Sequence, residues 1–154
     1  MKNFIIGAII LTSSSLANAV PNHWDKFDKQ GYKVYKIDDT KGRILRIHCN
    51  YAASDNQDNG VYLTINNKDY PNPSSPYPLR FMINNSIDME VSGNTKSKSE
   101  SKKWYEFTSA ITKAKTIDIF IENEIISTIY PKNPTALKDL AQCKSMYDRP
   151  KIGV

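Results

Sequence analysis

Apolar residues recur at every second position through most of this chain, and this alternation constrains the fold more than any other feature. The clearest run covers residues 45–51, where one side of an extended chain carries Leu45, Ile47, Cys49 and Tyr51. The other side carries Arg46, His48 and Asn50. A period of two is typical of half-buried strands. The same reasoning predicts strands over residues 32–37, 45–51, 61–66, 79–83, 87–91, 117–121 and 125–130.

The period changes twice, and each change predicts a short helix in the C-terminal half. Steps of three and four separate Trp104, Phe107, Ile111 and Ala114, with Ser101 as a candidate N-cap. A second helix is expected where Asn133 precedes Pro134, with Ala136, Leu137, Leu140 and Ala141 on its apolar side. Strands do not alternate with helices along the chain. We therefore expect an α+β fold that is β-rich, with a mainly antiparallel sheet or sandwich and two short helices.

Several polar stretches are expected to form loops. Residues 22–25 read as a polar lead-in, Asn59-Gly60 favours a tight reversal, and four prolines make residues 66–78 an extended loop. Residues 93–103 are polar and positively charged, which is typical of a mobile, solvated loop or of an electrostatic contact surface. The tail, residues 144–154, is expected to be loose.

The first nineteen residues have the pattern of a secretory signal peptide. Lys2 precedes an apolar run over residues 4–11, and small residues lead to Ala17-Asn18-Ala19. We expect cleavage between Ala19 and Val20, which leaves one periplasmic or secreted domain over residues 20–154. That segment carries 20 of the 21 basic residues and all 16 acidic ones. So mild an excess fits a protein partner or an anionic envelope polymer, and it does not indicate nucleic acid. No second apolar stretch follows the first, so we expect no transmembrane segment.

Export would place Cys49 and Cys143 in an oxidising compartment, where a cysteine pair usually forms a disulfide. The bridge would close a long loop and would add roughly 4 to 5 kcal/mol in the chain-entropy model. A metal or redox site is the alternative, but the sequence has no Cys-x-x-Cys, and His23 and His48 have no partners at ligand spacing. We therefore predict no metal and no other cofactor.

No catalytic motif stands out. Gly-x-Ser-x-Gly and His-Glu-x-x-His are both absent, so nucleophilic and zinc hydrolases are disfavoured. Carboxylates on predicted strands leave a glycan-acting enzyme open, although a solvated sheet face is the simpler interpretation; these residues are Asp88, Glu90, Asp118 and Glu122. The expectation is a protein that is not an enzyme and has no catalytic residues.

Recognition residues are predicted at two places. Tyr70 and Tyr77 lie inside the proline-rich loop, and tyrosine on ordered loops is typical of binding surfaces. The basic stretch adds Lys96, Lys98, Lys102 and Lys103. These features predict a binding protein, most simply an inhibitor or immunity-type protein that blocks a cell-wall hydrolase or toxin. An accessory role in a cell-surface or secretion apparatus is the alternative.

The C-terminal half also resembles a known family. The residues concerned are the run Phe107-Thr108-Ser109-Ala110-Ile111-Thr112-Lys113-Ala114, then Ile117-Asp118-Ile119, and Ala136-Leu137-Lys138-Asp139-Leu140 leading to Cys143. This order resembles small bacterial periplasmic proteins related to the invasion-associated locus B family. The resemblance implies a periplasmic, β-rich domain without a known catalytic site, and it carries over no functional residue.

Overall fold

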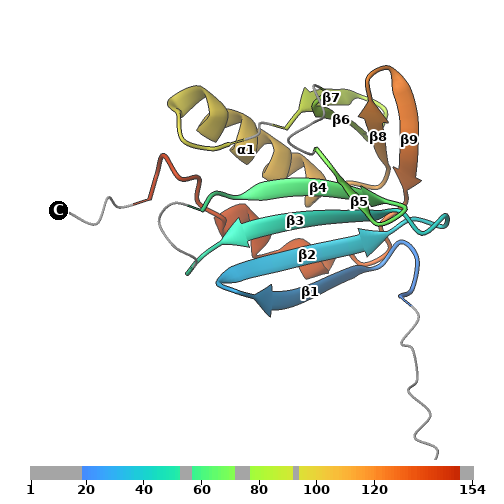
Figure 1. Ribbon diagram of the computed structural model, residues 1–154, viewed down its shortest axis with the longest axis horizontal. Coiled ribbons are helices and arrows are strands. Elements are labelled where there is room, and N and C mark those ends of the chain that lie inside the picture. Colours follow the sequence, from blue (N-terminus) through green and yellow to red (C-terminus); the bar gives the residue numbers. More distant parts are fainter. Residues whose placement is uncertain (1–18, 53–56, 72–76, 92–93, 150–154) are drawn as a thin grey trace, which may run out of the picture.

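The computed structural model describes residues 19–52, 57–71, 77–91 and 94–149. It contains two antiparallel sheets and one α-helix (Figure 1). The predicted class, a β-rich α+β fold with mainly antiparallel pairing, is confirmed. The predicted signal peptide lies outside the described residues, apart from Ala19 at its end. Among the residues described, no helix is both long enough and apolar enough to cross a membrane.

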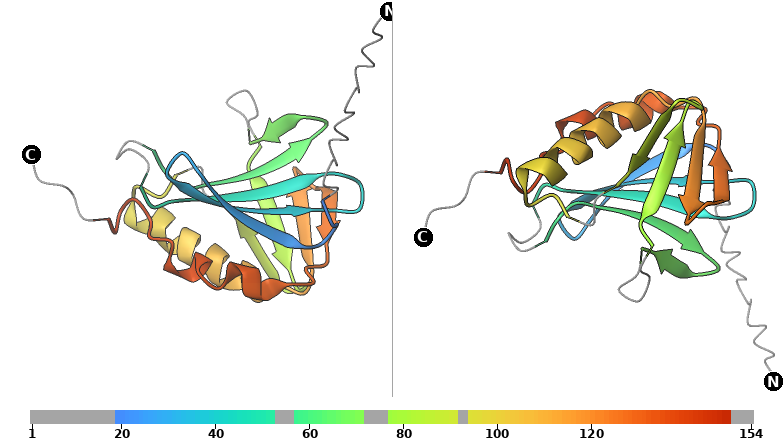
Figure 2. Two further views of the ribbon diagram at one scale, coloured as in Figure 1. Left: turned by 90° about the horizontal axis from the view of Figure 1, so that it is seen from below. Right: turned by 90° about the horizontal axis from the view of Figure 1, so that it is seen from above.

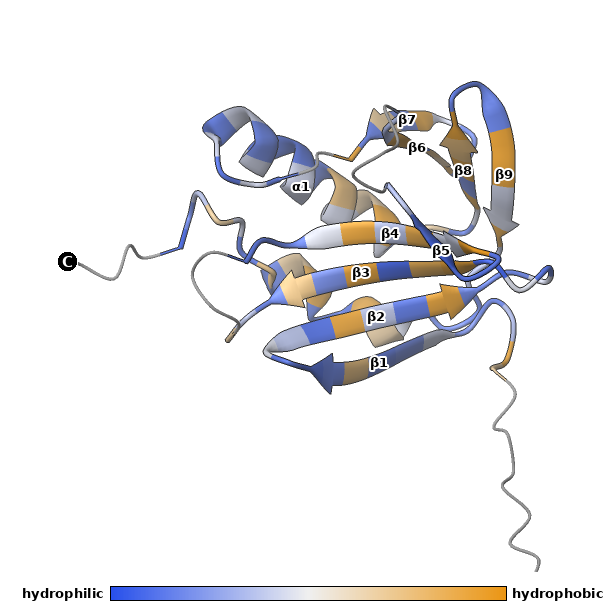
Figure 3. Ribbon diagram, in the orientation of Figure 1, coloured by the Kyte–Doolittle hydropathy of each residue, from blue (hydrophilic) through white to orange (hydrophobic). Residues whose placement is uncertain are grey.

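The first sheet is a meander of five strands in chain order. Its strands are β1 (Trp24–Lys29), β2 (Tyr32–Asp38), β3 (Ile44–Asn50), β4 (Gly60–Ile65) and β5 (Lys68–Tyr70). The alternation predicted for β3 holds, because Leu45, Ile47 and Cys49 are buried and His48 faces the other side. Figure 3 shows these alternating stripes along β2, β3 and β4. Tyr51 departs from the prediction, since it lies beyond the strand and is 59% exposed.

The second sheet has four strands in the order β7-β6-β8-β9. They are β6 (Leu79–Ile83), β7 (Ile87–Glu90), β8 (Ile117–Ile121) and β9 (Glu124–Ile129). Strand β6 pairs with β8 as well as with β7, so α1 (Lys98–Ile111) is inserted between strands of one sheet. The strands of this sheet run across those of the first sheet (Figures 1 and 2).

The core lies between the two sheets and is closed by α1. Trp104, Phe107 and Ile111 are at most 2% exposed, which confirms the predicted helical stripe. The Phe107 ring lies 5.1 Å from the Phe81 ring of β6. Ala114 is buried too, but it follows the end of the helix.

The predicted disulfide is present. Cys49 of β3 and Cys143 are joined at an S–S distance of 2.05 Å, and they are separated by 94 residues. Trp104 lies beside this bridge, because its indole Nε1 donates to the carbonyl oxygen of Cys143 at 2.9 Å. The cross-link therefore fastens the C-terminal segment both to the first sheet and to α1.

Two strands were missed because they lack apolar alternation. Strand β1 replaces part of the expected lead-in; Trp24 is its one buried residue, and the others are exposed. Strand β5 lies in the stretch that we expected to be an extended loop. The tight reversal expected at Asn59-Gly60 is also wrong, because Gly60 begins β4 and the buried Asn59 side chain accepts from the Asn50 backbone N–H at 2.9 Å.

Both predicted helices differ from what the structure shows. Helix α1 begins at Lys98 with Ser97 as its N-cap, so residues 98–103 are helical and not a solvated loop. The second helix is replaced by two short 3-10 turns, η1 (Pro134–Leu137) and η2 (Leu140–Gln142). Asn133 does not cap η1, because its side chain holds the backbone of Trp24 through bonds of 2.6 and 3.0 Å.

The prediction of a loose tail is wrong for residues 144–149. Ser145 is fully buried, and the backbone N–H groups of Met146 and Tyr147 donate to Thr95. Arg149 donates to the carbonyl oxygen of Asn50 and to the side chain of Asn59. This segment is part of the folded unit, and residues 150–154 lie outside the described residues.

Candidate functional site

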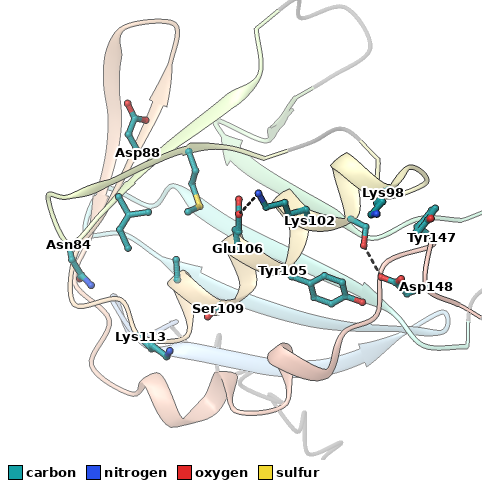
Figure 4. Close-up of a pocket in the computed structure, with 14 residues that line it drawn as sticks. Asn84, Asp88, Lys98, Lys102, Tyr105, Glu106, Ser109, Lys113, Tyr147 and Asp148 are labelled. Carbon is teal, nitrogen blue, oxygen red and sulfur yellow. Dashed lines mark hydrogen bonds and ion pairs between the residues drawn. The ribbon is translucent and has the colours of Figure 1, made fainter.

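A groove runs along the outward face of α1 and has a volume of about 970 Å³ (Figure 4). Strand β7 and the turn before it form one wall, and Tyr147 and Asp148 close one end. The helix supplies the floor because its outward residues recur at steps of three and four. These are Lys98, Lys102, Tyr105, Glu106 and Ser109, and Lys113 follows just beyond the end of the helix.

The apolar part of the groove comes from two elements. Strand β7 contributes Ile87 and Met89, and Ile87 is 40% exposed. Helix α1 contributes Tyr105 and Ala110, both partly buried. Apolar side chains at the centre of a concave surface, with charged groups around them, are typical of a site that binds a ligand or a partner.

The charges at the rim are distributed unevenly. Lys102 is 3.6 Å from Glu106, and Arg80 is 3.4 Å from Asp88. Lys98 and Lys113 line opposite ends of the groove, and neither forms an ion pair with another described residue. Lys98 begins α1 and Lys113 lies just past its end, so roughly the whole length of this 14-residue helix, about 21 Å, lies between them.

One end of the groove is held by hydroxyl groups. The Ser101 and Ser145 hydroxyls each donate to the Asp148 carboxylate at 2.7 Å. These hydrogen bonds, first from Ser145 and then from Ser101 and Tyr105, hold the pKa of Asp148 below its ordinary value. Ser101, our candidate N-cap, is instead a buried residue in the second turn of α1 that ties the C-terminal segment to the helix.

Ser101 is the buried member of this cluster, with only 4% of its surface exposed. Its hydroxyl donates to the Asp148 carboxylate and lies 2.8 Å from the hydroxyl of Ser145, so the side chain links α1 to the C-terminal segment. The two histidines lie elsewhere. Within the part of the chain that the structure describes, no three His, Cys, Asp or Glu side chains gather where they could hold a metal ion.

His48 lies on the outer face of the five-stranded sheet. Its ring sits between Tyr32 and Tyr62, with centroids 5.6 and 5.0 Å away. Burial, together with the positive charges of Arg46 and Lys29, lowers the pKa of His48 to about 4. The imidazole is therefore neutral at neutral pH and packs as an aromatic residue.

The structure separates the predicted recognition residues. Lys98 and Lys102 line the groove, whereas Lys96 precedes the helix and Lys103 pairs with Glu100 at 3.6 Å. Tyr70 ends β5 and packs against the core, while Tyr77 is 46% exposed; neither lines the groove. The loop between these tyrosines, residues 72–76, lies outside the described residues.

Most of the groove was missed at the sequence level. The outward face of α1 carries a readable signal, because Tyr105, Ser109 and Lys113 fall opposite the apolar stripe at helical spacing. The contributions of Ile87, Met89 and Tyr147 have no local signal, since three distant segments meet only in the fold.

The fold and the groove together define a disulfide-linked, β-rich α+β domain with a concave surface between a helix and an edge strand. Residues 22–136 match the YfjT family, and the chain belongs to that family. The matched segment ends before Cys143 and Asp148, so the disulfide and one end of the groove extend beyond it. No curated protein and no solved structure matches the chain. The resemblance to the invasion-associated locus B family remains a prediction.

Proposed function

We propose that this protein is a non-enzymatic binding protein that acts outside the cytoplasm, where it blocks a cell-wall hydrolase or toxin. The groove between α1 and β7 is the observation that carries the proposal. It offers an apolar centre with tyrosine, and lysines at its rim, which is the composition expected of a surface that receives another protein. The Cys49–Cys143 disulfide supports an oxidising compartment.

The domain also suits the role of a rigid blocking element. Helix α1 is anchored from beneath by Trp104 and Phe107, and the hydroxyl cluster around Asp148 fixes the C-terminal end of the groove. A surface held in its binding conformation loses little entropy when a partner docks. This preorganisation favours tight, stoichiometric inhibition.

The test is site-specific photo-crosslinking in the periplasm of a Gram-negative host. p-Benzoylphenylalanine replaces Ser109, which is exposed in the groove, and the matched control carries it at Lys103, which is exposed on α1 outside the groove. We expect the Ser109 probe to capture one soluble hydrolase or toxin, and the Lys103 probe to capture much less of it.

The captured enzyme is then assayed with the purified protein. We expect stoichiometric inhibition that is lost in a double variant, Lys98→Glu with Lys113→Glu. The control, Lys41→Glu with Lys68→Glu, makes the same change in net charge at two exposed lysines outside the groove. Capture of a set of envelope proteins without inhibition would instead establish the accessory role. Equal capture by both probes would show that the groove is not the binding surface.

A further inference from the structure

Strand β7 is an edge strand, and its free edge opens beside the groove. Among the strands that the structure describes, it pairs with β6 alone, in the order β7-β6-β8-β9. The Val91 N–H donates to the Leu79 carbonyl oxygen, and hydrogen-bonded pairs alternate along an antiparallel ladder. Met89 and Ile87 therefore direct their backbone groups toward β6. Asp88 and Glu90 direct their N–H and C=O groups toward the free edge.

The side chains of β7 divide between two faces. Ile87, Asp88 and Met89 all border the groove, but the Asp88 carboxylate points away from the helix (Figure 4) and lies 3.4 Å from Arg80. Because side chains alternate, Glu90 shares the face of Asp88. A strand added to β7 would therefore place every second side chain over the outward face of α1.

Charge complementarity distinguishes between possible occupants of this edge. A second copy of β7 would bring its own Asp88 and Glu90 opposite the same two acids, and like charges that face each other across strands are destabilising. A strand from another protein with basic residues on that face would be attracted. On the groove face, acidic residues at either end would meet Lys98 and Lys113, with apolar residues between them above Tyr105 and Ala110.

We propose that an extended segment of a protein partner adds to β7 as a fifth strand of this sheet, with basic residues on its outer face and apolar and acidic residues toward α1. This inference rests on the proposed function and names how the groove holds its partner. A segment of about seven residues spans roughly 20 Å, which matches the length of the 14-residue helix α1, about 21 Å.

The probe is an acetylated and amidated heptapeptide, Asp-Lys-Val-Lys-Val-Lys-Asp. Its valines and terminal aspartates would face the groove, and its lysines would lie opposite Asp88 and Glu90. The backbone N–H groups of the lysines would then point toward β7. N-methylation of the lysines should abolish binding, whereas N-methylation of the valines removes donors that point away and should be tolerated.

Peptide binding is then compared between two matched variants of the protein. Both Asp88→Pro and Asp88→Ala remove the carboxylate that lies 3.4 Å from Arg80, but only proline removes the outward N–H. Proline is tolerated on an edge strand where its nitrogen faces away from the ladder, so pairing with β6 is kept. Near-ultraviolet circular dichroism and the thermal midpoint verify the fold of each variant.

We expect the peptide to bind with slowed amide exchange at Asp88 and Glu90, and binding to Asp88→Pro to be at least about tenfold weaker than to Asp88→Ala. Equal binding to both variants, no effect of lysine N-methylation, or absence of peptide binding would overturn strand addition. So would a wild-type dimer in sedimentation that only Asp88→Pro disrupts, because the occupant would then be a second copy.

The failure of this inference is distinguishable from failure of the proposed function. If the Ser109 probe captures an enzyme that the protein inhibits, and Asp88→Pro inhibits as well as Asp88→Ala, the function stands and strand addition is wrong. If the peptide binds as expected but no captured protein is inhibited, strand addition stands and the inhibitor role is wrong.

Discussion

On one face of α1, Trp104 and Phe107 are buried in the core, whereas on the opposite face Lys102 and Ser109 line an open groove. The buried face is fixed by its contacts with both sheets and with the segment that holds the disulfide. The groove face makes few contacts that the fold needs. One helix thus has a face that stabilises the core and a face that we propose for binding, and substitutions on the two faces should have different consequences.

The largest effect is expected from the cross-link that supports the buried face. Replacing Cys49 and Cys143 with Ser should lower the free energy of unfolding by roughly 4 kcal/mol, because the closed loop is 94 residues long. Denaturant unfolding measures this loss, and the reduced wild-type protein should match the double variant. A loss below about 1 kcal/mol would show that packing alone fixes α1.

Phe107→Ala tests the buried face of α1 itself. The side chain is fully buried and contacts the ring of Phe81, so its removal should cost about 3 to 5 kcal/mol. Ser109→Ala, two residues further along the helix, should change the free energy of unfolding by less than about 0.5 kcal/mol. Similar losses of unfolding free energy in both variants would show that the two faces of α1 do not differ in their importance for stability.

Ser101→Ala tests the boundary between the faces. The substitution removes a buried hydroxyl that contacts Ser145 at 2.8 Å and donates to Asp148, and it should cost about 1 to 3 kcal/mol. The pKa of Asp148 should move up toward its ordinary value, which NMR titration can follow. An unchanged pKa would show that Ser145 and Tyr105 hold this carboxylate without Ser101.

Acidification tests the contribution of His48, which lies on the first sheet and does not line the groove, to the free energy of unfolding. The pKa of His48 is about 4 in the folded protein and 6.5 unperturbed, so the unfolded chain binds more protons between these values. The contribution of neutral His48 to the free energy of unfolding is fully present above about pH 6.5 and declines as the pH falls toward 4. Because the ring is partly exposed, we expect a loss of about 1 kcal/mol. His48→Gln should remove this part of the pH dependence, and an identical pH profile would contradict the assignment.

The smallest change in stability is expected on the groove face. The double variant Lys98→Glu with Lys113→Glu should unfold within about 0.5 kcal/mol of the wild type, since neither lysine is paired with a described residue. Denaturant unfolding measures stability, and the inhibition assay measures binding. A large loss of stability would mean that the groove lysines serve the fold.

The sequence predicts those elements whose side chains carry a period. Strand β3 and the stripe of α1 could be placed because buried residues recur at steps of two or at steps of three and four. The disulfide was predictable for another reason, because the only two cysteines of an expected exported protein usually pair. The start of α1 was placed too late, at Ser101, although Ser97 and Glu100 have the Ser-x-x-Glu spacing of a capping box.

The elements that escaped prediction depend on tertiary contacts. Edge strand β1 buries only Trp24, so most of its residues resemble a loop. Ser145 lies in a polar stretch and is buried because Ser101 and Asp148 satisfy its hydroxyl. The groove could not be foreseen, because its wall, floor and end come from segments that are distant in sequence.

The meander order of the first sheet also has a consequence for biogenesis. Strands β1 to β5 are neighbours in both sequence and space, so they can pair as soon as residues 24–70 have been synthesised. The residues that cover their apolar face, Phe81 and Trp104 among them, come later in the chain. A chain cut after residue 70 would therefore leave the apolar face of this sheet uncovered, and an uncovered apolar surface of this kind favours aggregation during folding.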